Sequence, residues 1–235
     1  MGYGYYYYGM DPMYLLIVLS CIIALIAQIK VKSTYSKYSN YRAGSGLTGA
    51  DAARRILDMN GIYDVIVEHV PGSLTDHYDP RSKTLRLSDS VYGSSSIAAI
   101  GVAAHECGHA IQHNVGYAPL VIRNSIVPVV NIASQLSWLF ILAGLFFGTA
   151  PVLIKVGIIM FSLSVLFQLI TLPVEFNASG RALSILSDSG MLYPDEVTGA
   201  KKVLSAAAMT YVAAALTAVL QLLRLIMLFG RRSDD

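Results

Sequence analysis

The chain has 235 residues, of which 54% are hydrophobic and only 14% are charged. A soluble globular protein usually carries about 25% charged residues, so this composition favours an integral membrane protein. The formal net charge of +2 is too small to indicate nucleic-acid binding. Two cysteines, Cys21 and Cys107, cannot build the disulfide framework of a small secreted protein.

The first apolar stretch, residues 13–29, contains no charged residue. As a helix it would rise about 25 Å, close to the thickness of the hydrocarbon core of a bilayer. It lacks the basic start and the small-residue cleavage site of a signal peptide, so we expect an uncleaved anchor. The tyrosine-rich segment at residues 2–9 fits either an interfacial collar or a short disordered tail.

Two further apolar stretches, residues 126–147 and 152–172, are separated by a break so short that it predicts a helical hairpin. A fourth stretch, residues 203–229, is rich in alanine, and small residues allow close helix packing in lipid. The sequence therefore predicts three or four transmembrane helices.

Basic residues near the ends of these stretches lie almost entirely on one side of the predicted membrane. They are Lys30, Lys32, Lys37, Arg42, Arg123, Arg181, Lys201 and Lys202. The positive-inside rule makes this side cytoplasmic and puts the N-terminus outside. Arg231 and Arg232 depart from the rule if the fourth stretch crosses completely, so the sequence leaves that crossing open.

Between the first and second spans, the sequence has the pattern of a small α+β unit. Thr48 and Asp51 fit a capping box, and Gly61 follows the helix that this box would open. Alternating β-branched residues between turns indicate strands, and serines at 94–96 can cap an apolar helix. The predicted elements are a helix at 48–59, strands at 63–70, 74–79 and 84–88, and a helix at 97–113.

The expected fold is an α-helical integral membrane protein with a small α+β unit on the cytoplasmic face. We expect five parts along the chain. They are an N-terminal tail and anchor at 1–29, the α+β unit at 30–125, a transmembrane hairpin at 126–172, a cytoplasmic segment at 173–202, and a C-terminal membrane helix and tail at 203–235.

The last helix of the α+β unit contains His105-Glu106-Cys107-Gly108-His109, an H-E-x-x-H motif. Residues four apart project from one helix face, so the two imidazoles can bind one metal ion. Glu106 lies about 100° further round, where it can reach an attacking water without binding the metal. Cys107 faces away from the histidines and is expected to be a small core residue.

A catalytic zinc site needs a third protein ligand. His113 lies about 12 Å along the helix from the first histidine, which is too far. Apart from Glu106, the glutamates are Glu68, Glu175 and Glu196. The first is expected to face solvent from a strand, and Glu196 falls in a loop or helix start. Glu175 is at the cytoplasmic edge of the third span, where a carboxylate usually has a partner, and we predict it as the third ligand.

The motif His105–His109 followed by Glu175-x-x-Ala178-Ser179 resembles the glutamate-zincins of the HtpX and CAAX prenyl protease type. Those families usually have Asp where this chain has Ser179. The chain is more similar to the bacterial membrane zinc metallopeptidases of the YugP type. Segments that carry this resemblance are VKSTYSKYS, LTGADAARRIL, LTDHYDPRSKTLRLSDSVY, VAAHECGHAIQH and TLPVEFNASGRAL. It implies a zincin-like catalytic unit, one Zn²⁺ per chain and a polypeptide or membrane-protein substrate.

Several further residues are candidates for supporting roles. Ser179 lies one helical turn after Glu175 and can orient a metal ligand. The oxyanion of the reaction needs a hydrogen-bond donor besides the metal, and no spacing rule selects among the candidates His77, Tyr78, Asn177 and Arg181. The resemblance to zincins also suggests that the strand at 84–88 is an edge strand that pairs with an extended peptide.

The leading hypothesis is a zinc endopeptidase at the cytoplasmic face of a bacterial inner membrane, with no nucleic-acid partner. A second is a zinc-stabilised scaffold or chaperone without catalytic activity, against which Glu106 argues because a structural site needs no general base. A third is a channel or transporter. It is disfavoured because the spans hold few polar residues besides Lys155, Gln168 and Arg224.

Overall fold

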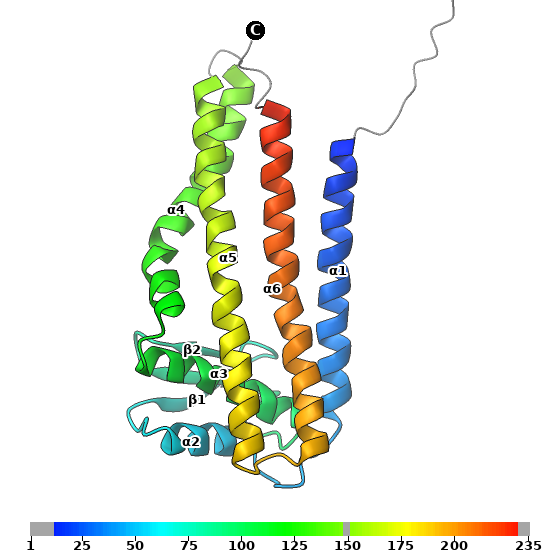
Figure 1. Cartoon of the computed structure of the whole chain (residues 1–235), viewed down its shortest axis with the longest axis vertical. Coiled ribbons are helices and arrows are strands. Elements are labelled where there is room, and N and C mark those ends of the chain that lie inside the picture. The colour runs from blue at the N-terminus through cyan, green and yellow to red at the C-terminus, as the bar shows by residue number, and fades with distance from the viewer. Residues whose placement is uncertain (1–11, 148–150, 230–235) are drawn as a thin grey trace, which may run out of the picture.

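The computed structural model describes residues 12–147 and 151–229. Within these ranges, the helices that are long and apolar enough to cross a membrane are α1 (Pro12–Ser39), α4 (Ala118–Phe147), α5 (Pro151–Asp188) and α6 (Pro194–Phe229). α1 packs on α6, α6 on α5 and α5 on α4, and the smaller elements gather at one end of this bundle (Figure 1). The predicted fold class, a helical membrane protein with a small α+β unit, is confirmed.

The bundle presents its apolar side chains outward. The most apolar window of α1 has a mean hydropathy of 2.4, and only 6% of that window is buried by the rest of the protein. Such a surface would be unstable in water, whereas lipid tails solvate it and the helix satisfies its own backbone groups. The tyrosine-rich segment, residues 148–150 and the arginines at 231 and 232 lie outside the described residues.

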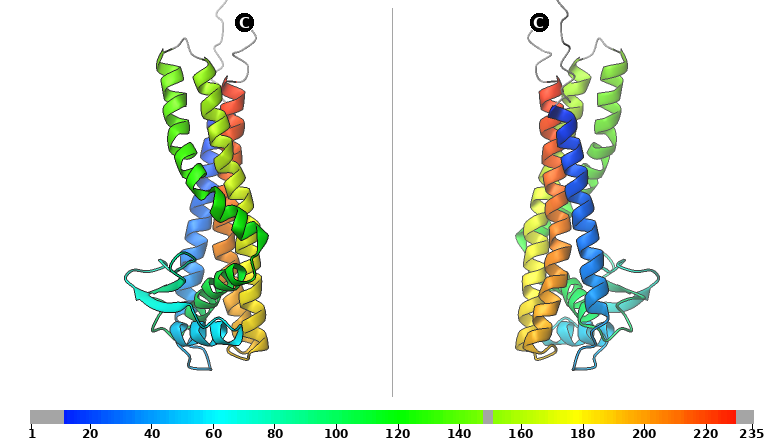
Figure 2. Two further views of the ribbon diagram at one scale, coloured as in Figure 1. Left: turned by 90° about the vertical axis from the view of Figure 1, so that its left-hand side faces the viewer. Right: turned by 90° about the vertical axis from the view of Figure 1, so that its right-hand side faces the viewer.

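Small residues and a proline shape the α4–α5 hairpin. A Cβ added to Gly157 of α5 would lie 2.6 Å from Ile141 Cγ1 and 2.8 Å from the Ser137 carbonyl oxygen, so only glycine permits this approach. Pro128 lies inside α4, where it removes a backbone donor and bends the helix (Figure 2). The part of α4 before this bend lies near the α+β unit.

The helices continue beyond the apolar stretches that were predicted from hydropathy. α1 runs on to Ser39, α5 continues through Pro173 to Asp188, and α6 begins at Pro194. Most of the expected cytoplasmic segment at 173–202 is therefore helical. The backbone stays helical because hydrogen bonding along a helix does not depend on whether its surroundings are lipid or water.

The α+β unit begins with α2 (Gly49–Met59). Its capping box is present: the Asp51 N–H donates to Thr48 Oγ1 at 3.1 Å, and the Thr48 N–H donates to Asp51 Oδ2 at 3.0 Å. Gly61 follows with a φ of +69°, as a helix-terminating glycine should. The strands are β1 (Ile66–Val70), β2 (His77–Asp79) and β3 (Thr84–Ser88), the first two of them shorter than predicted.

The strand at Thr84–Ser88 is not an edge strand, so that prediction is wrong. The sheet has the order β1-β3-β2, with β1 parallel and β2 antiparallel to β3. Leu85 and Leu87 of β3 are fully buried, which explains why this strand takes the centre. Within the described residues, the edges of the sheet are β1 and β2.

Helix α3 (Ile97–Asn114) joins the α+β unit to the bundle. The Ala99 N–H donates to Ser96 Oγ at 3.2 Å, so Ser96 caps the helix as expected. α3 packs against α2 on one side and against α5 and α6 on the other. Cys107 is fully buried, which confirms its place in the core, and burial raises the pKa of its thiol.

Gly108, inside the H-E-x-x-H motif, marks a close approach of α3 to α5. A Cβ at this position would lie 2.6 Å from the carbonyl oxygen of Ala178, an atom that cannot move without shifting α5. We expect Gly108→Ala to lower the free energy of unfolding by about 1–3 kcal/mol, the range for overpacked cores. Thermal unfolding of the detergent-purified protein measures this effect.

Gly180→Ala on α5 is the matched control, because a Cβ there meets nothing within 4 Å. Alanine is the better helix former, so this variant should be as stable as the wild type or more stable by up to about 1 kcal/mol. Equal melting temperatures for the two variants would contradict the close approach.

Candidate metal centre

The structure brings three side chains with metal-binding atoms together from two helices. His105 and His109 project from one face of α3, and Glu175 reaches them from α5. Glu175 Oε2 lies 3.3 Å from His105 Nε2 and 3.6 Å from His109 Nε2. All candidate ligand atoms lie within 4.8 Å of one another.

These distances fit a tetrahedral zinc ion. Zinc binds imidazole nitrogen and carboxylate oxygen at about 2.0–2.2 Å, so two ligand atoms of a tetrahedral site are about 3.4 Å apart. The two separations from Glu175 Oε2, 3.3 and 3.6 Å, fall on either side of that value. Two histidines and one carboxylate are also a donor set of catalytic zinc sites, which keep the fourth position open.

Each imidazole is held by a hydrogen bond at its other ring nitrogen. His105 Nδ1 lies 3.1 Å from Ser179 Oγ, and His109 Nδ1 lies 3.0 Å from Gln112 Oε1. Ser179 therefore lies where a residue that orients a metal ligand is expected. Both contacts leave Nε2 as the nitrogen that faces the Glu175 carboxylate.

The contacts of Gln112 determine the tautomer of His109. The Gln112 amide nitrogen donates to the Val174 carbonyl oxygen at 2.8 Å and to Asn177 Oδ1 at 3.0 Å. The amide oxygen must then face His109, and it can only accept. His109 Nδ1 is consequently the donor, and the neutral ring has an unprotonated Nε2 with its lone pair directed at the metal position.

Gln112 was not predicted as a site residue. Its side chain is fully buried in α3, three residues after His109. A glutamine three residues after a candidate metal-binding histidine, at the end of an apolar helix, is the signal that was available. Burial of its amide is tolerable because both ends of the group are hydrogen-bonded.

Glu175 is almost fully buried, with 3% of its surface exposed. Its second oxygen, Oε1, accepts a hydrogen bond from Arg123 Nη1 of α4 at 3.3 Å. A buried carboxylate needs such partners, since an unpaired charge in an apolar region is costly. Arg123 was identified from sequence only as a residue that determines membrane orientation, and its contact with Glu175 was missed.

The other glutamates outside the H-E-x-x-H motif are engaged elsewhere. Glu68 is exposed and pairs with Arg86 at 3.4 Å. Glu196 is in the first turn of α6, where it accepts hydrogen bonds from the backbone N–H groups of Gly44 and Tyr193 at 2.7 and 2.8 Å.

His113, which was rejected as a third ligand, also has a different partner: its Nδ1 lies 2.9 Å from the hydroxyl of Tyr78. Among the described residues, only Glu175 joins the two histidines.

Two cavities flank the three candidate ligands, with volumes of about 240 and 180 Å³. The larger lies between the loop before β2 and helices α1, α3, α5 and α6, and the smaller is bounded by β2 and the start of α4. Both are lined by Asp76, Glu106, Glu175 and Tyr211. Glu106 therefore borders the space on both sides of the ligands, which suits a group that must reach a water molecule there.

Asp76 and Tyr211 were not predicted as site residues. Asp76 accepts hydrogen bonds from the backbone N–H and the hydroxyl of Ser88, at 2.7 and 3.0 Å, which ties the loop before β2 to the sheet. Burial raises the pKa of Asp76. Tyr211 lies on the alanine-rich helix α6. It is the one tyrosine of that helix, and this was the only signal in the sequence that could have indicated a site residue there.

The four oxyanion candidates fall into two groups. His77 and Tyr78 line the 180 Å³ cavity, and burial raises the pKa of Tyr78 to about 12. Asn177 and Arg181 line neither cavity at the ligands. Instead, Asn177 Oδ1 accepts from Arg181 Nε at 2.8 Å and from Gln112, so this pair supports the residue that orients His109.

Comparison with known proteins gives a match along nearly the whole chain. Residues 13–230 match the model of a family described as "Putative neutral zinc metallopeptidase". The "Putative membrane protease YugP" of Bacillus subtilis (strain 168) is 56% identical over 209 residues, which cover 89% of this chain and 92% of that protein. No solved structure matches the chain. The chain therefore belongs to the family described as "Putative neutral zinc metallopeptidase".

Proposed function

We propose that the protein is a zinc-dependent endopeptidase that hydrolyses peptide bonds at the cytoplasmic face of the bacterial inner membrane. The observation that carries this proposal is the spacing of three ligand atoms around one tetrahedral position, with the Glu106 side chain beside it. A zinc ion held by His105, His109 and Glu175 would lower the pKa of a water molecule and polarise the scissile carbonyl.

Glu106 is the general base and acid of the proposed reaction. Its carboxylate takes a proton from the attacking water, whose oxygen forms a bond to the carbonyl carbon of the substrate. As the C–N bond breaks, Glu106 gives this proton to the leaving amine, so the residue returns to its starting state. His77 and Tyr78, which line the smaller cavity, are the candidates that can donate a hydrogen bond to the oxyanion.

The substrate in this proposal is an extended polypeptide or a segment of a membrane protein. β2 is an edge strand, and two of its residues line the 180 Å³ cavity beside the ligands, so a peptide paired with β2 would pass the proposed zinc position. The larger cavity lies between membrane helices, which would admit a substrate from the bilayer.

The cytoplasmic orientation rests on the positive-inside rule. The ends of α1, α5 and α6 that carry Lys37, Arg181 and Lys201 are the ends where the α+β unit lies (Figure 1). The five-part division of the chain is likewise our proposal. In this division, the proposed ligand Glu175 of α5 meets the proposed ligands His105 and His109 of the α+β unit at the cytoplasmic face.

Replacing Glu106 by Gln should abolish peptide hydrolysis while the zinc content stays unchanged. Loss of a general base typically lowers turnover by a factor of about 10² to 10⁴. The measurement is cleavage of a fluorogenic peptide library by detergent-purified protein, with Glu68→Gln as the control because that side chain is exposed and away from the site. Undiminished turnover in Glu106→Gln would exclude it as the base, and a wild type that binds zinc without any cleavage would favour the scaffold hypothesis.

Replacing Glu175 by Ala should remove zinc. We expect one zinc per chain in the wild type and a metal content near zero in the variant after dialysis, because two histidines alone hold the ion weakly and Arg123 is left beside the empty position. Metal analysis by mass spectrometry on the purified proteins, with Glu68→Ala in parallel, measures this. A variant that keeps its full zinc load would require another third ligand.

Replacing Gln112 by Met, which keeps the length of the side chain, should weaken zinc binding by about 10 to 100-fold without removing any ligand. The reason is that His109 loses the acceptor that holds its Nδ1 proton. Titration against a competing chelator gives the affinity. His113→Gln, one residue further along α3, should leave it unchanged, and an equal loss in both variants would point to general damage of the helix.

A further inference from the structure

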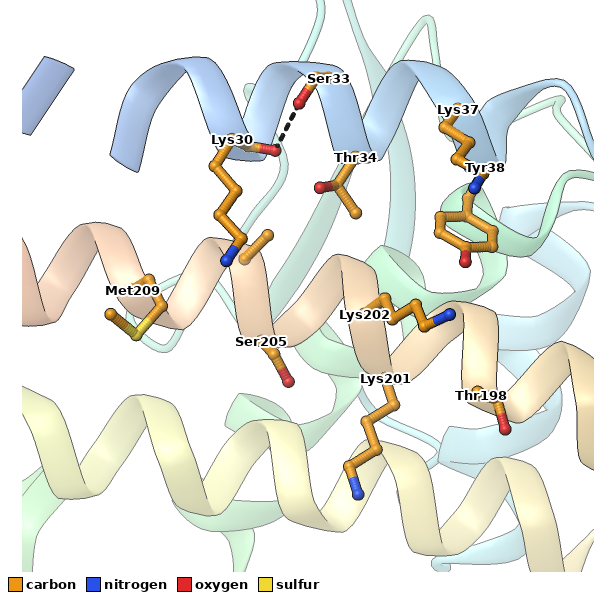
Figure 3. A pocket seen from close by; sticks show the side chains of 11 residues that line it. Lys30, Ser33, Thr34, Lys37, Tyr38, Thr198, Lys201, Lys202, Ser205 and Met209 are labelled. Carbon is orange, nitrogen blue, oxygen red and sulfur yellow. Dashed lines mark hydrogen bonds between the residues drawn. The ribbon is translucent and has the colours of Figure 1, made fainter. Parts of the chain in front are cut away.

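A groove of about 640 Å³ lies between α1 and α6 at the end of the bundle where the α+β unit lies (Figure 3). It shares no lining residue with the two cavities at the metal centre. The groove is therefore a separate space, and a ligand bound there would not occupy the candidate metal centre.

The two walls of the groove have the same helical spacing. Positions i, i+3, i+4 and i+7 lie on one face of a helix. α1 contributes Lys30, Ser33, Thr34 and Lys37, and α6 contributes Thr198, Lys201, Lys202 and Ser205. Each helix thus contributes ammonium and hydroxyl groups to the lining of the groove. In Figure 3, Lys30 and Thr34 point from α1 toward α6, whereas Lys201 and Ser205 point from α6 away from α1.

The groove has a strong positive charge that the described residues do not balance. Its lining includes four lysines and no acidic residue, and none of these lysines forms an ion pair with any residue that the structure describes. Lys37 Nζ lies 5.6 Å from the centre of the Tyr38 ring, a cation–π contact that attracts the ammonium group without neutralising its charge. Four like charges around one hollow repel each other, so the site favours a bound anion.

Beyond the lysines, both stripes become apolar in the direction of the membrane interior. On α1, Ile26 and Ile22 lie one and two turns before Lys30 and are exposed. On α6, Met209 lines the groove, and Leu216 follows it two turns later, also exposed. A ligand that fits both parts has an anionic head and apolar chains.

We propose that this groove binds an anionic phospholipid. The phosphate lies among the four lysines, where hydroxyl groups offer further hydrogen bonds, and the acyl chains lie along the apolar stripes of α1 and α6. Basic pockets between membrane helices at the bilayer surface recognise anionic head groups in this way. Topology alone requires lysines near this surface but does not require two helices to line one groove with four of them.

The test uses the full-length protein purified in detergent and titrated with phosphatidylglycerol, phosphatidylcholine or inorganic phosphate, with binding counted by native mass spectrometry and by the shift in Tm. Phosphatidylglycerol should bind in preference to the other two. Each lysine removed should cost about fivefold in affinity, so Lys30→Gln combined with Lys202→Gln should weaken binding by roughly 25-fold. Lys32→Gln is the matched control, because Lys32 is exposed on α1 at the same level and does not line the groove.

If Lys32→Gln also lost about fivefold in affinity, as much as is expected for each groove lysine, the proposal would be overturned in favour of general surface attraction. Equal binding of phosphatidylcholine would also overturn it, and equal binding of inorganic phosphate would show that the lipid assignment is wrong. If the double variant does not fold, Lys201→Gln alone, with an expected fivefold loss, decides the matter. None of these measurements depends on peptide hydrolysis, so their outcome is separate from that of the proposed function.

Discussion

The arrangement of the site depends on one buried charge, the carboxylate of Glu175. An apolar helix can hold such a group only if partners compensate it, and these come from two other helices. The imidazoles of His105 and His109 approach one oxygen from α3, and Arg123 of α4 approaches the other. Two local features are consistent with this requirement: α4 contains Pro128, five residues after Arg123, and Gly108 lets α3 lie close to Ala178 of α5.

Much of the fold could be predicted because its signals are local. Four apolar runs of sufficient length indicate membrane helices, and the capping residues Thr48 and Ser96 mark helix starts within a single turn. The H-E-x-x-H spacing depends only on helix geometry, so the juxtaposition of His105 and His109 followed from it. Glu175 could be selected because the chain has few glutamates and this one lies at the edge of an apolar span, where an unpaired charge would be costly.

What could not be predicted depends on contacts between distant parts of the chain. The tautomer of His109 is determined by Gln112, and Gln112 is in turn held by Val174 and Asn177, more than 60 residues away in the sequence. The central position of β3 follows from its parallel pairing with β1, and alternation of residue types does not reveal which strand is flanked on both sides. Asn177 was a candidate for direct catalysis, yet the structure places it behind the histidine that it helps to hold.

The pairing of α1 with α6 has a consequence for both of the proposals. On α1, residues 28 and 31 line the larger cavity at the candidate metal centre, and residues 30, 33 and 34 line the lysine groove. On α6, residues 204, 207, 208, 210 and 211 line the cavity, and residues 205, 206 and 209 line the groove. Because a helix turns 100° per residue, positions two apart face nearly opposite sides, and the same two helices form a wall of each space. The spacing of α1 from α6 therefore sets the width of the groove and of the cavity together. An anion bound in the groove would therefore contact the same two helices that border the cavity beside Glu106 and Glu175, without touching either residue.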